Sequence, residues 1–146
     1  MDINTPEFRN LVTELSLPIV ANVAPNEVPY FDLLAEQYFD DPAPPDIDDA
    51  ALDIGLVVDL APAVLAAIGA ALPYILPHVL DAVKDISVDA IKEWLKKRRE
   101  QQKDDFTAEQ MQQIEATTRK VLKQWKISEK KTNQVIAEMR RSLVAS

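Results

Sequence analysis

The sequence predicts an all-α fold, a small helical bundle built around one central apolar segment. Hydrophobic residues make up 47% of the 146 residues and aromatic residues only 6%, so aliphatic side chains must supply most of the core. All ten prolines lie between Pro6 and Pro77, which leaves the second half without a proline to interrupt its helices. No stretch alternates apolar and polar residues for long enough to predict a β-sheet.

Residues 1–39 are predicted to form an acidic segment with two short helices. Thr5 can cap the first helix with Pro6 in its first turn, and Pro18 is expected to end or bend it. Asn26 can cap a second helix of about 14 residues, whose apolar stripe recurs at helical spacing. The predicted stripe consists of Tyr30, Leu33, Leu34, Gln37 and Tyr38.

Residues 40–53 form an acidic linker that contains Pro42, Pro44 and Pro45. A residue that precedes proline is disfavoured in the helical region, and clustered carboxylates resist burial. We therefore expect an extended, exposed linker that is open to an activating protease.

Residues 54–80 form an apolar segment in which Asp59 is the single formally charged residue. A helix over residues 60–80 would be about 31 Å long, which matches the roughly 30 Å hydrocarbon core of a bilayer. From Leu60 to Leu72 apolar residues occupy every side of such a helix, so it must be enclosed all round. Length and composition therefore fit either a membrane span or a buried core helix.

The prolines of this segment favour a soluble arrangement. Pro62, Pro73 and Pro77 would each destabilise an internal helical position by about 3 kcal/mol in water. We expect breaks near 62 and 72–77, which give either a proline-broken central helix or a central helical hairpin.

Residues 81–146 are predicted to be amphipathic and helical, with one helix from about Pro77 to about Gln101. Thr107 and Gln110 form a capping-box pattern that begins the next helix, which should end near Lys126. Ser128 can then cap a last helix, so the two final helices are expected to form an antiparallel hairpin.

Charge is divided unevenly along the chain. Residues 1–83 carry 14 acidic residues and one basic residue, whereas residues 84–146 carry 15 basic and 10 acidic residues. This division indicates either that the halves attract each other or that they face different surroundings. Nucleic acid is not an expected partner, because the net charge is −8 and the basic residues 96–99 spread around a helix.

The chemical inventory does not point to an enzyme. There is no cysteine, and His78 is the single histidine. The two glycines are isolated, so they cannot build a phosphate-binding loop, and the linker aspartates lack the glycine of a calcium loop. We therefore predict a non-enzymatic protein without a cofactor or a metal site.

Our first functional hypothesis is a membrane-active helical effector that acts by pore formation or membrane disruption. Residues 54–80 would be masked in the resting state and released by cleavage of the linker or by partner binding. The residues expected to insert are Leu60, Val64, Leu65, Ile68, Leu72, Ile75, Leu76 and Leu80. The residues expected at the anionic lipid surface are Lys96, Lys97, Arg98 and Arg99.

The alternative is a soluble all-helical adaptor, inhibitor or assembly subunit. It would bind a protein partner through the C-terminal hairpin, with Met111, Val121, Trp125 and Met139 as contacts, although core packing explains these residues equally well. The N-terminus does not look like a signal peptide, so we expect a cytoplasmic protein, which the membrane hypothesis would move to the inner face of the membrane. The oligomeric state, a homo-oligomer included, stays open.

Overall fold

A computed structural model describes residues 5–44, 59–82, 86–101 and 106–143. Within these ranges the chain forms six α-helices and one 3-10 helix, with no strand, and this confirms the predicted all-α fold. The elements are α1 (Pro6–Val23), the 3-10 helix η1 (Pro25–Tyr30), α2 (Phe31–Asp40), α4 (Leu60–Ala82), α5 (Val88–Gln101), α6 (Ala108–Gln124) and α7 (Glu129–Leu143).

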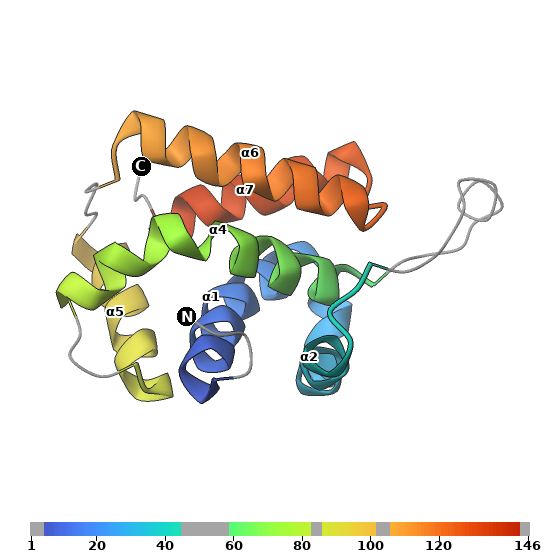
Figure 1. Cartoon of the computed structure of the whole chain (residues 1–146), viewed down its shortest axis with the longest axis horizontal. Helices are drawn as coiled ribbons and strands as arrows, with labels where there is room; N and C mark the ends of the chain where they lie inside the picture. The colour runs from blue at the N-terminus through green and yellow to red at the C-terminus, as the bar shows by residue number, and fades with distance from the viewer. Residues whose placement is uncertain (1–4, 45–58, 83–85, 102–105, 144–146) are drawn as a thin grey trace, which may run out of the picture.

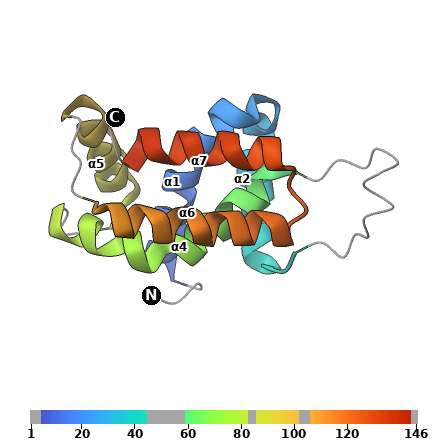
Figure 2. The ribbon, with the colours of Figure 1, turned by 90° about the horizontal axis from the view of Figure 1, so that it is seen from above.

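The helices are stacked in layers around α4. Figure 1 shows the α6–α7 hairpin above α4, with α1 and α2 below it and α5 at one end. Figure 2 shows α6 and α7 side by side, seen from above. The most extensive contact of α4 is with α6, followed by α1 and α2. The apolar segment is therefore the central layer of the fold.

The first helix is longer than the sequence suggested. The Thr5 hydroxyl caps it by accepting a hydrogen bond from the Phe8 N–H at 3.2 Å, as predicted. The expected end or bend at Pro18 is wrong, because α1 runs through this residue to Val23. Ile19, Val20 and Val23 are all buried beyond the proline. Their burial offsets the backbone hydrogen bond that Pro18 cannot donate.

The second helix differs from the prediction in its start and in its buried face. Residues 25–30 form the 3-10 helix η1, and the α-helix begins only at Phe31. The Asn26 side chain makes no capping hydrogen bond. Tyr30, Leu33 and Gln37 are exposed, and the buried face is made of Phe31, Leu34, Ala35 and Tyr38. Pro25 and Pro29 lie in η1, and a 3-10 helix has about 3.0 residues per turn instead of about 3.6. The buried face of α2 is therefore rotated relative to the predicted stripe.

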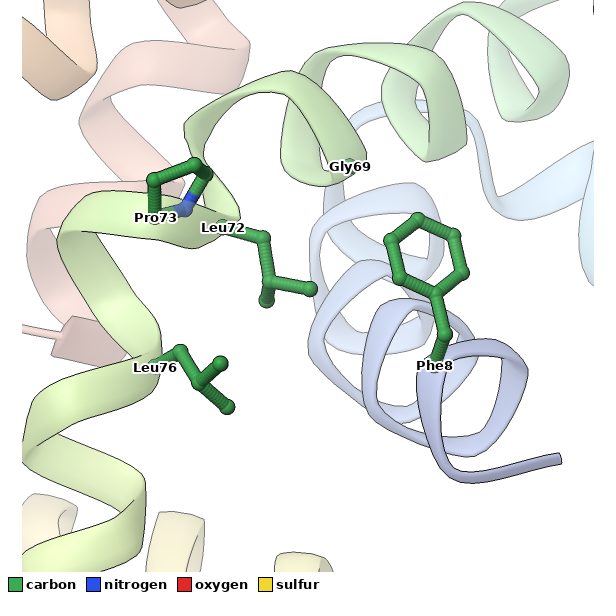
Figure 3. Close-up of a pocket in the computed structure, with 5 residues that line it drawn as sticks. All are labelled: Phe8, Gly69, Leu72, Pro73 and Leu76. Atoms are coloured by element: carbon green, nitrogen blue, oxygen red, sulfur yellow. The ribbon is translucent and has the colours of Figure 1, made fainter. Parts of the chain in front are cut away.

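The central helix is continuous from Leu60 to Ala82, so neither the predicted helical hairpin nor a break in the helix at 62 or 72–77 is present. Pro73 and Pro77 lie inside it. Figure 3 shows the helix ribbon changing direction near Pro73, as expected where a proline removes a backbone hydrogen bond. Burial of Leu72, Ile75 and Val79 on the inner side holds the bent helix together.

The single helix expected from Pro77 to Gln101 is also wrong. Residues 86 and 87 are not helical, and α5 begins at Val88. The Ser87 hydroxyl accepts a hydrogen bond from the Ala90 N–H at 3.2 Å, which is the interaction of an N-cap. A serine cap therefore starts a new helix without a proline or glycine nearby.

The C-terminal hairpin forms as predicted. Both halves of the capping box are present between Thr107 and Gln110. The helix α6 ends at Gln124, and Lys126 takes the left-handed conformation, with φ 62°, in the turn. The Ser128 hydroxyl then accepts from the Lys131 N–H at 3.2 Å and caps α7.

Candidate binding site on the central helix

One side of α4 is not covered by the other helices, and the complete enclosure predicted for residues 60–72 is wrong at Ala70. Ala70, Pro73, Pro77 and Leu80 are exposed, and they recur at intervals of three or four residues. Residues at this spacing lie on one side of a helix. Three of these four residues are alanine or proline, whose side chains are small. The uncovered stripe therefore exposes little apolar surface to solvent.

An apolar pocket opens beside this stripe, between α1 and the bent part of α4. Its volume is about 280 Å³, and it is lined by Phe8, Gly69, Leu72, Pro73 and Leu76. Figure 3 shows the Leu72 and Leu76 side chains pointing from α4 toward α1, and the Phe8 ring lying across from Gly69. We call this pocket, together with the exposed residues Ala70, Pro77 and Leu80, the α4 groove.

Glycine at position 69 shapes one wall of the α4 groove. A Cβ atom added to Gly69 would lie 3.3 Å from Cζ of Phe8, which is tighter than most contacts of this kind. Glycine therefore lets the Phe8 ring approach the backbone of α4 closely. Pro73 also lines the pocket, at the point where the ribbon of α4 changes direction (Figure 3).

The start of α4 is fixed by a carboxylate from another element. Glu27 of η1 is only 7% exposed, and its two oxygens accept hydrogen bonds from the N–H groups of Leu60 at 2.9 Å and Ala61 at 2.8 Å. These N–H groups have no partner within their own helix, and a negative charge is favourable at a helix N-terminus. Glu27 thus joins the N-terminal segment to the apolar helix.

The far half of α4 meets a stack of rings and a buried cation. The His78 ring lies 3.9 Å from the Phe106 ring between centroids, and the Arg98 guanidinium lies 5.1 Å from Phe106 and 4.9 Å from Trp94. Arg98 is 3% exposed, and its Nε donates to the Leu143 carbonyl at 3.0 Å. The stack therefore links α4, α5 and the end of α7.

The residues predicted to insert into a membrane lie mainly in the core. Leu76 is partly buried against the core and Leu80 is exposed at 54%. The six others are all buried: Leu60, Val64, Leu65, Ile68, Leu72 and Ile75. Residues 54–58 lie outside the described residues. In this conformation the candidate inserting residues are thus the packing surface of the bundle.

The four consecutive basic residues do not form one surface. Lys96 and Lys97 are exposed, whereas Arg98 points into the ring stack. The Arg99 side chain is not among those the structure describes. Consecutive positions of a helix point in different directions, so the placement of Arg98 follows from its position on the inner side of α5.

The residues predicted to bind a partner through the hairpin are largely internal. Trp125 is 6% exposed and Met139 is 1% exposed, while Met111 and Val121 are partly buried against the same core. The Met139 sulfur also accepts from the Thr118 hydroxyl at 3.5 Å. The Trp125 ring also lies 5.9 Å between centroids from the ring of Tyr38 on α2, so in this conformation the four residues belong to the packed core rather than to a free surface.

The linker prediction falls largely on residues that are not described. Asp40 ends α2, residues 41–44 are exposed and non-helical, and residues 45–53 lie outside the described ranges. The exposure of residues 41–44 agrees with the predicted start of the linker.

Titratable groups do not gather at the α4 groove. Burial raises the pKa of the Glu14 carboxyl above its ordinary value, and the nearby Lys92 ammonium opposes that rise. Burial also raises the pKa of the Tyr38 hydroxyl. Across the parts of the chain that are described, no group of three or more acidic or histidine side chains is arranged to hold a metal ion.

Sequence patterns did not identify Phe8, Gly69 or Glu27 as members of a site. Phe8 follows the apolar periodicity of α1, and Gly69 stands alone among apolar residues. Glu27 could have drawn attention as an acidic residue in a short proline-flanked stretch, although 33 positions separate it from Leu60. These residues act through long-range contacts that a local pattern does not encode.

Comparison with known proteins gives no family. No protein family, no curated protein and no solved structure matches this chain. Among the described helices, Leu60–Asp81 is long and apolar enough to cross a membrane by length and composition, and half of it is buried in the bundle. The core helix of a soluble protein has the same properties.

Proposed function

We propose that this protein acts without catalysis, as a helical interaction protein that binds an apolar side chain of a protein partner in the α4 groove. The observation that carries this proposal is an apolar pocket beside the one uncovered stripe of the central helix. Apolar pockets that receive an anchoring side chain are typical of the centres of protein interfaces.

The pocket suits a side chain better than a free small molecule. Its volume of about 280 Å³ is at the lower end of the roughly 300–1,000 Å³ typical of ligand pockets. None of the five lining residues has a titratable or hydrogen-bonding side chain, so the pocket offers nothing to orient a polar ligand or to move a proton. A hydrophobic side chain on a partner helix is small enough for this volume and needs no polar group to bind.

Peptides selected for binding to the full chain test this function. Ala70→Glu places a charge at the rim of the α4 groove at an exposed position, so it should block binding without unfolding the protein. Ala116→Glu is the matched control, because Ala116 is exposed in the middle of α6. We expect apolar-anchored peptides whose affinity falls at least about tenfold with Ala70→Glu. Equal binding to both variants would reject the α4 groove as the binding site.

Membrane insertion is the second candidate function. It is favoured by the Glu27 clamp, by which we mean the two hydrogen bonds that the Glu27 carboxylate accepts from the N–H groups of Leu60 and Ala61. Glu27 lies before the acidic linker, and the N–H groups it binds lie after it. Cleavage between residues 40 and 53 would leave the clamp as a contact between two separate chains, which is lost more easily than a contact within one chain. The helix that would then be released has the length of a membrane span.

Vesicle leakage separates the two candidates. We expect the intact chain to leave vesicles of phosphatidylserine and phosphatidylcholine sealed, and the chain cut within the linker to permeabilise them if α4 inserts. The exposed Lys96 and Lys97 would then meet the anionic headgroups. Sealed vesicles after complete cleavage would reject membrane insertion and leave the interaction protein as the function.

A further inference from the structure

A second apolar surface lies at the junction of η1 and α2, away from the α4 groove. Four large hydrophobic side chains are exposed among the described residues, and three of them fall within residues 28–33. Val28 is 39% exposed, Tyr30 is 54% exposed and Leu33 is 55% exposed. Clustered exposed hydrophobic residues are typical of interaction sites, whereas single ones are common on any surface.

Two exposed acidic residues lie close to these positions in the sequence, on α2. Asp32 and Glu36 are exposed on α2, on either side of Leu33 in the sequence, and α2 contains no basic residue. In residues 5–44 the single basic residue is Arg9, whose guanidinium lies 5.2 Å from the centre of the Phe39 ring. We call Val28, Tyr30, Asp32, Leu33 and Glu36 together the η1–α2 face.

The chemistry of the η1–α2 face selects the kind of partner. Its carboxylates repel anionic lipid and nucleic acid, and they attract a basic surface. Its apolar residues favour a partner that also presents apolar side chains, because the burial of Leu33 contributes most to binding when apolar area on both proteins is removed from water.

The described parts of a second copy of this chain do not supply both features. The exposed basic residues Arg119, Lys120 and Lys123 lie on α6, where no exposed large hydrophobic residue is found among the described positions. Outside the η1–α2 face, the large hydrophobic residue that is exposed in the described ranges is Leu80 on α4. The described helices of a second copy would therefore offer basic residues without apolar anchors.

We propose that the η1–α2 face docks a basic amphipathic helix from a protein partner. Leucine-like anchors on that helix would cover Tyr30 and Leu33, and its flanking Lys or Arg side chains would pair with Asp32 and Glu36. This docking site is independent of the α4 groove, so it holds or fails separately from the function proposed above.

A synthetic helical peptide of about 18 residues is a suitable probe, with Leu at helical spacing on one side and Lys on the other. Added to the isotope-labelled full chain, it should shift the amide resonances of residues 28–36. Leu33→Ala should weaken binding about tenfold, because it removes the most exposed apolar anchor. The double variant Asp32→Asn, Glu36→Gln should weaken binding severalfold and reduce its dependence on salt.

Leu80→Ala is the matched control, because Leu80 is exposed at 54%, almost the same as Leu33, but lies on α4. It should leave peptide binding unchanged. The proposal is overturned if the peptide does not bind, or if a version with Glu in place of every Lys binds equally well. It is also overturned if Leu80→Ala and Ala70→Glu weaken binding while Leu33→Ala does not, and that result would support the α4 groove instead.

Discussion

The two halves of α4 are both rich in apolar residues but differ in their surroundings. In the first half, Ala63, Ala67 and Ala71 are completely buried, and this row of small residues lets neighbouring helices approach closely. In the second half, Pro73 and Pro77 are exposed and Leu76 borders a pocket. One continuous helix therefore packs as core in its first half and borders the proposed α4 groove in its second half.

The two halves are also held by different forces. Glu27 binds backbone N–H groups at the start of the helix, which fixes its position along the axis. His78 near the other end packs its ring against Phe106, which in turn packs against Arg98. Hydrogen bonds to a backbone are directional, whereas ring contacts allow several arrangements. The contacts of the second half thus allow more adjustment than those of the first half.

Truncating one leucine in each half gives the largest expected contrast. Leu65 is completely buried, so Leu65→Ala should lower the free energy of unfolding by about 3 kcal/mol. Leu76 is only partly buried, so Leu76→Ala should lower it by about 1 kcal/mol. Urea denaturation of both variants measures the difference. Equal losses would mean that both halves are core.

Removing the clamp should have the next largest effect. Glu27→Ala leaves two buried N–H groups without their acceptor, so we expect a loss of about 2–3 kcal/mol. Glu27→Gln keeps one carbonyl acceptor and should lose roughly half as much. Glu36→Ala, at an exposed position of α2, is the control and should change stability by less than about 0.5 kcal/mol. If Glu27→Ala lowers the free energy of unfolding by less than about 1 kcal/mol, the Glu27 hydrogen bonds do not hold the start of α4 in place.

The ring stack should contribute less to the free energy of unfolding, because the desolvation of the buried Arg98 cation offsets part of the stabilisation from its contacts. Arg98→Ala removes contacts with two rings and with the Leu143 carbonyl, and should destabilise the fold by about 2 kcal/mol. Hydrogen exchange should also become faster in the last turn of α7. Lys97→Ala serves as the control, since Lys97 is exposed next to Arg98 in the same helix. If hydrogen exchange in the last turn of α7 is unchanged in the Arg98→Ala variant, Arg98 does not stabilise that end of the helix.

The parts of the fold that the sequence predicts well are those determined by neighbouring residues. The caps of α1, α6 and α7 use side chains that bond to backbone groups three positions away, so each is visible as a short pattern. The buried stripe of α7 is local in the same sense, because Val135, Ile136 and Met139 recur at helical spacing and are all buried.

Most parts that were predicted wrongly depend on distant contacts, whereas the missed start of α5 is local, because Ser87 bonds to Ala90 three positions away. Pro18 and Pro73 are tolerated inside helices because tertiary burial on both sides outweighs the lost hydrogen bonds. The inward position of Arg98 depends on Phe106 and Leu143, which belong to other elements. The α4 groove requires Phe8 to meet Gly69, and no local pattern indicates that contact.

Gly69 lies where the two halves of α4 meet, and Gly69→Ala should have the smallest effect. Alanine in a helix interior is favoured over glycine by about 1 kcal/mol, but its Cβ would press on the Phe8 ring. Because Phe8 lines the pocket, we expect its ring to shift by the few tenths of an ångström that this contact requires. We therefore expect a net gain of about 0.5 kcal/mol, or roughly 2 °C in Tm.

The neighbouring substitution Ala70→Gly is the matched control, since it changes helix propensity at an exposed position without touching Phe8. It should destabilise the fold by about 1 kcal/mol. Together the two variants separate the backbone preference of α4 from the contact with α1. If Gly69→Ala destabilises the protein as well, the Phe8 ring is held rigidly, and the wall of the α4 groove belongs to the core half of the helix.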